Sequence, residues 1–149
     1  MFDASLKDMK ILILNGPNLN RLGLRKPEIY GSRTMAQILL EIQQNWPEVH
    51  FVYKQSNHEG DLVDKIQAAY GNTDGIVFNP AAYTHTSVAL LDALKAVSIP
   101  TVEVHISDVA SREDFRQVSY VRAACIATVA GHGLKGYLEA MDLLIGDGK

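Results

Sequence analysis

Short apolar runs alternate with helix-like segments along most of this sequence, and this alternation limits the fold more than any other feature. The apolar runs occupy residues 10–14, 49–54, 75–78, 101–105 and 125–130. Segments with apolar residues at helical spacing follow the first, second, third and fifth of these runs. They occupy residues 34–46, 60–70, 84–97 and 134–145. Strands that alternate with helices in this way predict an α/β fold, in which a five-stranded parallel sheet is covered by helices on both faces.

Local signals support the boundaries of these segments. The run Lys10 to Leu14 is followed by Asn15-Gly16-Pro17-Asn18, which is turn chemistry that ends a strand buried on both faces. Thr34 is suited to cap the first helix, and Pro47 ends it. Residues 18–33 show no hydrophobic period and contain several Arg, Gly and Pro residues, so we expect a mobile loop there.

The length of 149 residues fits a single domain. A domain of this size buries roughly 70% of the surface that its unfolded chain exposes, which is enough for one complete core. We expect residues 9–149 to form this single domain. Residues 1–8 show no pattern and are interpreted as an N-terminal extension.

Composition disfavours two classes of partner. The formal net charge is −3, so there is no excess of Lys and Arg to neutralise nucleic-acid phosphates or an anionic membrane surface. No apolar stretch approaches the roughly 20 residues that a spanning helix needs. The first eight residues carry early charges and no apolar segment, which predicts a cytoplasmic protein. The single cysteine, Cys125, lies among Ala and Ile, where a buried and inert thiol is expected.

Polar residues collect where the predicted strands end. In an open α/β sheet, ligands bind beyond the carboxyl ends of the strands, at the point where the topology changes direction. Arg112 and Arg116 follow the fourth strand closely. The arrangement therefore predicts a pocket for a small anion. The polar strand ends are Asn15 to Asn18, Gln55 to His58, Asn79-Pro80, His105 to Ser107 and Gly131 to Gly133.

His105 is the histidine with the clearest indication of a working role. It follows Glu103 by two residues, so both side chains leave the same face of a strand and the carboxylate could orient the imidazole. By contrast, His85 could simply cap the third helix, and His50 and His58 could be solvated.

No cofactor motif accompanies the predicted sheet. Residues 15–23 have neither the GxGxxG spacing of dinucleotide-binding folds nor the Gly-Lys-Ser/Thr of a phosphate-binding loop. The strand ends also lack clustered Cys, His and carboxylate ligands for a metal. We therefore expect chemistry carried by side chains, with no cofactor and no metal.

Five further motifs can be read along the sequence. They are Asn15-Gly-Pro-Asn-Leu-Asn20, Arg25-Lys-Pro-Glu-Ile-Tyr-Gly31, Gln55-Ser-Asn-His-Glu-Gly60, Asn79-Pro-Ala-Ala-Tyr-Thr-His-Thr-Ser87 and Glu103-Val-His-Ile-Ser107. In this order they resemble the motifs of the type II 3-dehydroquinate dehydratases, over a match from about Met9 to Leu144. The resemblance implies a flavodoxin-like, doubly wound fold and a homododecamer built from trimers. It implies conversion of 3-dehydroquinate to 3-dehydroshikimate and water by trans elimination through an enolate, the third step of chorismate biosynthesis in the shikimate pathway.

The same resemblance implies roles in the chemistry for five residues. Tyr30 would be the base, and Arg25 beside it would lower the pKa of Tyr30. Asn18 would stabilise the enolate through a bound water. His105 would be the acid that protonates the departing hydroxyl, with Glu103 in support.

Substrate contacts follow from the resemblance as well. Asn79 and the backbone of Ile106 and Ser107 would hold the substrate carboxylate. Ring hydroxyls would be bound by His85, Arg116 and Asp92, the last lent by a neighbouring subunit.

Three further positions complete the comparison with the family. Arg112 would belong to a closing lid. The chain departs from the family pattern at Leu91, where Arg is common, and at Arg122, where Ser is common; both departures put subunit contacts in doubt and lie outside the residues assigned to chemistry.

A tyrosine needs help to act as a base at neutral pH. With a reference pKa near 10, ionising it at pH 7 costs about 4 kcal/mol. One cation at a distance of about 4 Å contributes roughly the same amount at an effective dielectric of about 20. Arg25 is therefore sufficient by magnitude to activate Tyr30.

Alternative interpretations are weaker but remain open. A lysine imine mechanism would need a lysine at the carboxyl edge of the sheet, and neither Lys10 nor Lys54 lies there. A non-enzymatic flavodoxin-like module would bind a nucleotide or flavin. A receiver domain would need paired acidic residues where Asn15-Gly16-Pro17 stands. Catabolic breakdown of quinate would use the same active site as biosynthesis.

Overall fold

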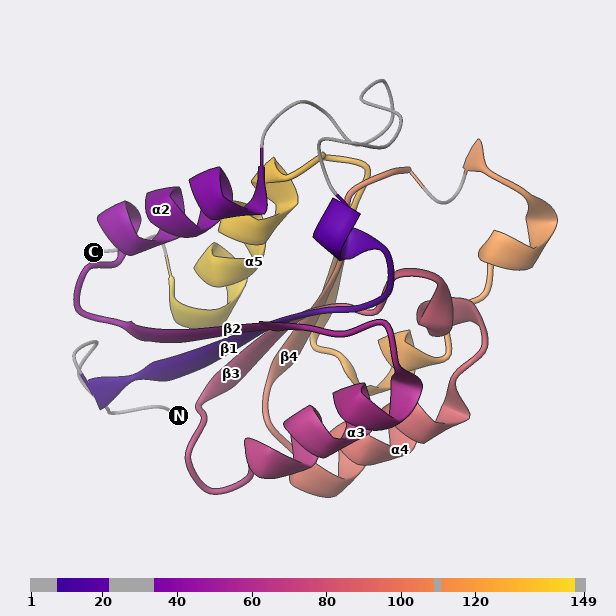
Figure 1. Cartoon of the computed structure of the whole chain (residues 1–149), viewed down its shortest axis with the longest axis horizontal. Coiled ribbons are helices and arrows are strands. Elements are labelled where there is room, and N and C mark those ends of the chain that lie inside the picture. Colours follow the sequence, from indigo (N-terminus) through magenta and orange to yellow (C-terminus); the bar gives the residue numbers. More distant parts are fainter. Residues whose placement is uncertain (1–7, 22–33, 109–110, 147–149) are drawn as a thin grey trace.

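A computed structural model describes residues 8–21, 34–108 and 111–146 of the chain, and it has the expected α/β architecture (Figure 1). The sheet consists of β1 (Lys10–Asn15), β2 (His50–Gln55), β3 (Gly75–Asn79), β4 (Thr101–His105) and β5 (Ala127–Ala130). The α-helices are α2 (Met35–Asn45), α3 (Glu59–Ala68), α4 (Val88–Val97) and α5 (Lys135–Ile145). Short 3₁₀ segments are η2 (Leu19–Arg21), η3 (Ala81–His85), η5 (Asp114–Arg116) and η6 (Val121–Ala124). None of the helices in these described ranges is long and apolar enough to cross a membrane.

The strand order is β2-β1-β3-β4-β5, and every neighbouring pair is parallel. This is the flavodoxin-like, doubly wound arrangement, which confirms the predicted fold class. The chain reverses its direction across the sheet between β1 and β3, where Asn15 is aligned with Asn79. Ligands of such sheets bind outside the carboxyl ends of the strands at this switch point. The topology therefore places both asparagines at the expected binding crevice.

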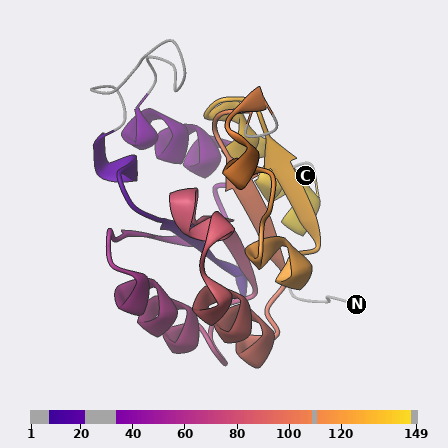
Figure 2. The same ribbon diagram turned by 90° about the vertical axis from the view of Figure 1, so that its right-hand side faces the viewer.

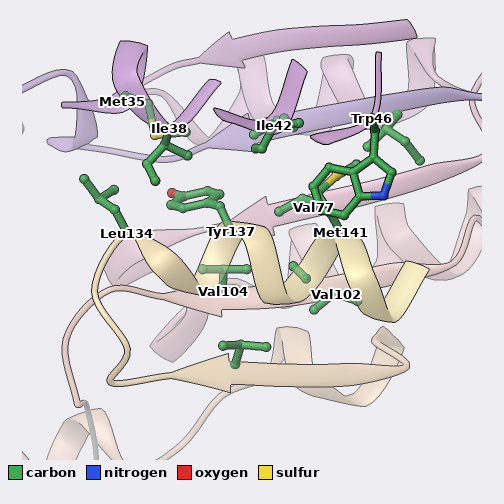
Figure 3. Packing of buried hydrophobic residues seen from close by; sticks show 14 of the residues in the cluster. Met35, Ile38, Ile42, Trp46, Val77, Val102, Val104, Leu134, Tyr137 and Met141 are labelled. Carbon is green, nitrogen blue, oxygen red and sulfur yellow. The ribbon is translucent and has the colours of Figure 1, made fainter. Parts of the chain in front are cut away.

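The sheet separates two apolar cores because successive strand residues face opposite sides. On β1, Ile11 and Ile13 pack on the side of α2 and α5, while Leu12 and Leu14 pack on the side of α3 and α4. Figures 1 and 2 show these two helix layers on either side of the sheet. Figure 3 shows the first core, where side chains of α2 and α5 meet over the sheet. The labelled residues there are Met35, Ile38, Ile42, Trp46, Val77, Val102, Val104, Leu134, Tyr137 and Met141.

The cap predicted for the first helix is present. The Thr34 hydroxyl accepts a hydrogen bond from the Gln37 backbone N–H at 3.2 Å, and the Gln37 side chain accepts one from the Thr34 N–H at 2.8 Å. This reciprocal capping box satisfies two donors that the first turn would otherwise leave without partners. The helix ends at Asn45 with Trp46 as its C-cap, directly before Pro47.

The prediction of one helix from about residue 84 is wrong, because the structure divides this stretch into two elements. The Ser87 hydroxyl accepts the backbone N–H of Leu90 at 3.0 Å, so Ser87 is the N-cap and α4 begins at Val88. The preceding residues form η3, which ends at His85. Ser87, and not His85, therefore caps this helix.

The fifth strand also begins later than the sequence predicts. Cys125 ends η6, donating its N–H to the Arg122 carbonyl at 3.0 Å, and the Ile126 N–H donates to the Thr101 carbonyl before β5 starts at Ala127. Cys125 is only partly buried. Burial nevertheless raises the pKa of its thiol to about 12, which agrees with the expected inert side chain.

Only the beginning of the predicted loop lies within the described residues. Leu19 to Arg21 form η2, and Leu19 is buried in the first core. The expectation of mobility falls on residues 22–33, which lie outside the described residues.

Gly16 provides a test of how tightly β1 and β3 meet at the switch point. Its N–H donates to the Asn79 carbonyl at 2.7 Å, and a Cβ on Gly16 would lie 2.5 Å from the Pro80 carbonyl oxygen. We expect Gly16→Ala to lower the free energy of unfolding by about 1 to 3 kcal/mol, because backbone must move to remove this overlap. Urea unfolding measures the change.

Gly60→Ala is the matched control, since a Cβ on Gly60, in the first turn of α3, meets nothing within 4 Å. This control should be unchanged or more stable by up to about 1 kcal/mol. Equal stability of both variants would contradict the close approach at Gly16.

Candidate active site

A histidine and a glutamate form a buried pair at the carboxyl end of β4. His105 Nε2 lies 2.5 Å from Glu103 Oε2, and the two side chains are 5% and 0% exposed. A carboxylate can only accept, so Nε2 carries the hydrogen of this bond and Nδ1 is the nitrogen left for proton exchange. Glu103 and His105 are thus paired through this bond, and the role of the pair in the chemistry stays a prediction.

Glu103 receives four further hydrogen bonds, from residues of other segments. Thr84 Oγ1 and Ser119 Oγ donate to Oε2 at 2.6 and 2.8 Å. Thr128 Oγ1 and Arg122 Nε donate to Oε1 at 3.1 and 3.4 Å. With His105, these donors occupy both oxygens of a carboxylate that is closed to water.

The donors keep Glu103 ionised despite its burial. Burial alone would raise the pKa of Glu103, but the hydrogen bond and charge of His105, followed by the hydroxyls of Thr84 and Ser119, lower this pKa to about 2. Glu103 thus carries a negative charge next to His105 at neutral pH. It stabilises the imidazolium form that a proton donor needs.

A second polar network lies on the opposite face of the sheet, beneath the switch point. The Tyr137 hydroxyl, on α5 and fully buried, donates to Asn15 Oδ1 at 2.6 Å and accepts from Asn79 Nδ2 at 3.0 Å. Asn15 Nδ2 donates to the Tyr53 hydroxyl at 3.3 Å, and Asn79 Oδ1 accepts the Ala81 N–H at 3.0 Å. These bonds fix the orientation of both amides and leave one N–H of Asn79 Nδ2 for a ligand.

The ends of β1, β2 and β3 are tied together around this network. Gln55 Nε2 donates to the Gly16 carbonyl and to Asn57 Oδ1, both at 3.1 Å. Asn57 Oδ1 also accepts the backbone N–H of Asn18 at 3.0 Å. Asn18 has φ +70°, in the left-handed region that Asn tolerates better than most residues. The backbone of Asn18 is thus held by a hydrogen bond just beyond the carboxyl end of β1, and its side chain is exposed.

The segment after β4 lies beside β5 and α5. The Gly131 N–H donates to the His105 carbonyl at 3.3 Å, and the Gly133 N–H donates to the Ile106 carbonyl at 3.0 Å. Arg112 Nη1 donates to Ser107 Oγ at 3.3 Å. Arg112 is therefore held beside Ser107, which follows His105 by two residues.

Other predicted site residues are not brought together with His105 by the contacts in the structure. His85 Nδ1 is hydrogen-bonded to the Val118 carbonyl at 2.6 Å. Arg116 Nε pairs with Glu113 at 2.8 Å, and its guanidinium lies 5.2 Å from the centre of the Phe115 ring. Asp92 is exposed on α4. Tyr30 and Arg25, the predicted base and its activator, lie outside the described residues.

Sequence reasoning missed the residues that complete the two networks. Thr84, Ser119, Thr128 and Arg122 converge on Glu103 from positions 16 to 25 residues away in the chain, and no local pattern marks them. Tyr137 had one available signal. It is the polar-tipped residue on the otherwise apolar inner face of α5, and a buried tyrosine hydroxyl needs a partner.

Within residues 8–21, 34–108 and 111–146, no group of three or more His, Cys, Asp or Glu side chains is arranged to hold a metal ion. Along the carboxyl edge of the sheet, β4 carries an imidazole with its buried carboxylate, β1 and β3 carry amides, and guanidinium groups lie on the following segments. A doubly wound sheet with this set along its carboxyl edge defines an acid–base enzyme for a small polar molecule.

Comparisons with known proteins identify the family. The model of the family "Dehydroquinase class II" matches residues 9–145. The 3-dehydroquinate dehydratase of Endomicrobium trichonymphae is 49% identical over 138 residues, covering 91% of this chain and 96% of that protein. That of Corynebacterium glutamicum is 50% identical over 139 residues, covering 91% and 94%.

Solved structures agree with the sequence relatives. The type II dehydroquinase of Butyrivibrio crossotus has a TM-score of 0.87 at 49% identity and covers 91% of this chain and 97% of its own. That of Propionibacterium acnes has a TM-score of 0.84 at 41% identity, covering 91% and 94%. The chain belongs to the class II dehydroquinase family.

The lowered pKa of Glu103 predicts a specific dependence of stability on pH. A carboxyl whose pKa falls from 4.5 to about 2 on folding stabilises the protein fully above about pH 4.5, and this stabilisation is lost as the pH falls through about 2. The stability difference between wild type and Glu103→Gln should therefore shrink by about 3 kcal/mol between pH 5 and pH 2. Urea unfolding at a series of pH values measures it.

Glu113→Gln is the control, because Glu113 is an exposed carboxylate whose ion pair with Arg116 is screened by water. Its stability difference from wild type should change little over the same range. A difference that stays constant for Glu103→Gln would show that Glu103 is not held as the ionised partner of His105.

Proposed function

We propose that this dehydroquinase converts 3-dehydroquinate to 3-dehydroshikimate and water in the shikimate pathway, by trans elimination through an enolate. The family and the relatives named 3-dehydroquinate dehydratase support this reaction. The observation that carries the proposal is the buried Glu103–His105 pair at the end of β4. Expelling a hydroxide next to an enolate needs a positioned proton donor, and this pair has the geometry of one.

His105 is the acid in this proposal. Hydroxide is a poor leaving group, so a proton must reach the hydroxyl as its bond to carbon breaks. Glu103 holds Nε2 of the imidazole and stabilises its protonated form, while Nδ1 delivers the proton. The new bond joins this proton to the departing oxygen, and the product is water.

The base half of the mechanism rests on the family resemblance. Tyr30, as a phenolate stabilised by Arg25, removes the proton next to the ketone. Asn18 holds a water that stabilises the enolate oxygen, and the exposed position of Asn18 just beyond β1 supports this role. No cofactor or metal takes part in this proposal.

Substrate binding uses groups at the carboxyl edge. The remaining N–H of Asn79 and the backbone of Ile106 and Ser107 bind the substrate carboxylate. Arg112, next to Ser107, belongs to the segment that closes over the site.

The ring hydroxyls contact residues farther from His105. His85 and Arg116 bind two of them, which requires Arg116 to exchange part of its pairing with Glu113 for substrate. Asp92 comes from a neighbouring subunit, in agreement with its exposure on α4. We propose a cytoplasmic homododecamer built from trimers, and sedimentation tests this assembly.

An ultraviolet assay tests the function directly. The product contains a carbonyl conjugated with a new carbon–carbon double bond, so absorbance should rise when 3-dehydroquinate is added. The rate should be the same with and without a chelator. A protein that yields no absorbance change, or that copurifies with a flavin or nucleotide, would contradict the proposal.

Tyr30→Phe tests the base. Removing the hydroxyl should lower kcat by at least about 10²-fold, because a positioned base contributes about that factor or more. The fold and the binding of 3-dehydroquinate, measured by calorimetry, should be largely retained. Tyr70→Phe, at an exposed tyrosine of the described part, is the control and should keep wild-type turnover. Near-normal turnover of Tyr30→Phe would refute the assignment.

A further inference from the structure

Arg122 reaches the carboxylate that orients His105, although it belongs to a different segment. Its Nε lies 3.4 Å from Glu103 Oε1, whereas His105 contacts Oε2. Glu103 is fully buried, whereas the Arg122 side chain is 49% exposed. Arg122 therefore extends from the protein surface to the buried carboxylate. In the part of the chain that the structure describes, His105 and Arg122 are the basic side chains that contact Glu103.

The backbone and the side chain of Arg122 contribute separately. The backbone N–H donates to Ser119 Oγ at 3.2 Å, and Ser119 Oγ in turn donates to Glu103 Oε2. Any residue other than proline at this position can make the backbone bond. The side chain adds a positive charge and a donor to the other carboxylate oxygen, which a neutral side chain cannot replace.

We propose that Arg122 is a positioning residue that shares the Glu103 carboxylate with His105, and so makes His105 a readier proton donor. The inference rests on the proposed function. The carboxylate stabilises the imidazolium, and a cation on its second oxygen offsets part of that stabilisation. The proton of His105 therefore passes more easily to the departing hydroxyl.

The surroundings of Glu103 leave this pair of charges as the dominant influence. The residues that approach the carboxylate from η3, β5 and the segment before η6 are Thr84, Thr128 and Ser119, which are neutral hydroxyls. Cys125 lies next to η6. Burial raises the pKa of its thiol, and the charge of Glu103 raises it further while that of Arg122 lowers it. The charges of Glu103 and Arg122 thus have opposite effects on a third group in the same region.

Arg122→Gln tests the proposal by removing the charge while retaining a polar side chain. With kcat measured at saturating 3-dehydroquinate, the alkaline limb reports loss of the proton from the acid. In Arg122→Gln this limb should move to higher pH by about half a unit, a modest shift because Arg122 is half-exposed and screened by water. Arg122→Lys, which retains a cation, should restore most of the wild-type profile.

Two further measurements separate this effect from a change in folding. Raising the salt concentration should move the alkaline limb of the wild type toward that of Arg122→Gln and leave the variant nearly unchanged, because salt screens the exposed guanidinium. Lys65→Gln removes a cation from the last turn of α3, away from Glu103, and should leave the profile unshifted.

A titration by NMR makes the test independent of turnover. The His105 imidazole of the intact protein without substrate should lose its proton at a higher pH in Arg122→Gln than in the wild type. If the wild type does not dehydrate 3-dehydroquinate, the proposed function fails while this titration still tests the coupling. If the wild type is active but neither the titration nor the kcat profile moves, the role of Arg122 is overturned and the function stands.

Discussion

The buried charge of Glu103 is the constraint on which the site depends. An ionised carboxylate without water costs several kcal/mol unless donors surround it. Here five donors do so, and four of them come from segments other than β4. Those segments must therefore take fixed positions relative to β4 when the chain folds. As a consequence, the orientation of His105 is a property of the folded protein before any substrate arrives.

The two faces of the sheet carry different polar networks. On β4, Val102 and Val104 face the core beneath α5, while Glu103 and His105 face η3 and η6. On β1 and β3, Asn15 and Asn79 face the side of α5, where the Tyr137 hydroxyl joins them. Both polar networks occur where the strands end. The Glu103 network lies on the face of the sheet that carries α4, and the Tyr137 network lies on the face that carries α5. Proton transfer and carboxylate binding are therefore each attached to a different helix layer.

The sequence predicts whatever is encoded at short range. The alternation of strands and helices follows from local hydrophobic periods, and the pairing of Glu103 with His105 follows from their spacing along one strand. The predicted start of α4, at about Thr84, is wrong by about four residues. Ser87 caps the helix, whereas the Thr84 hydroxyl donates to Glu103, and this long-range contact cannot be read from the local sequence. Arg122 reaches Glu103 across 19 residues, and no period or spacing indicates such a contact.

The acid of the proposed mechanism is held in place within the described structure. His105 is fixed by a buried carboxylate at the end of β4, an inner strand of the sheet. Tyr30 and Arg25, the proposed base and its activator, lie outside the described residues. A donor fixed in advance costs no reorganisation when the hydroxyl departs, but a carboxylate that stabilises the imidazolium too strongly would retain its proton. A second cation on the carboxylate resolves this conflict, since it weakens the retention of the proton without loosening the hydrogen bond that orients the ring. The position of Arg122 on Oε1, with His105 on Oε2, meets both requirements.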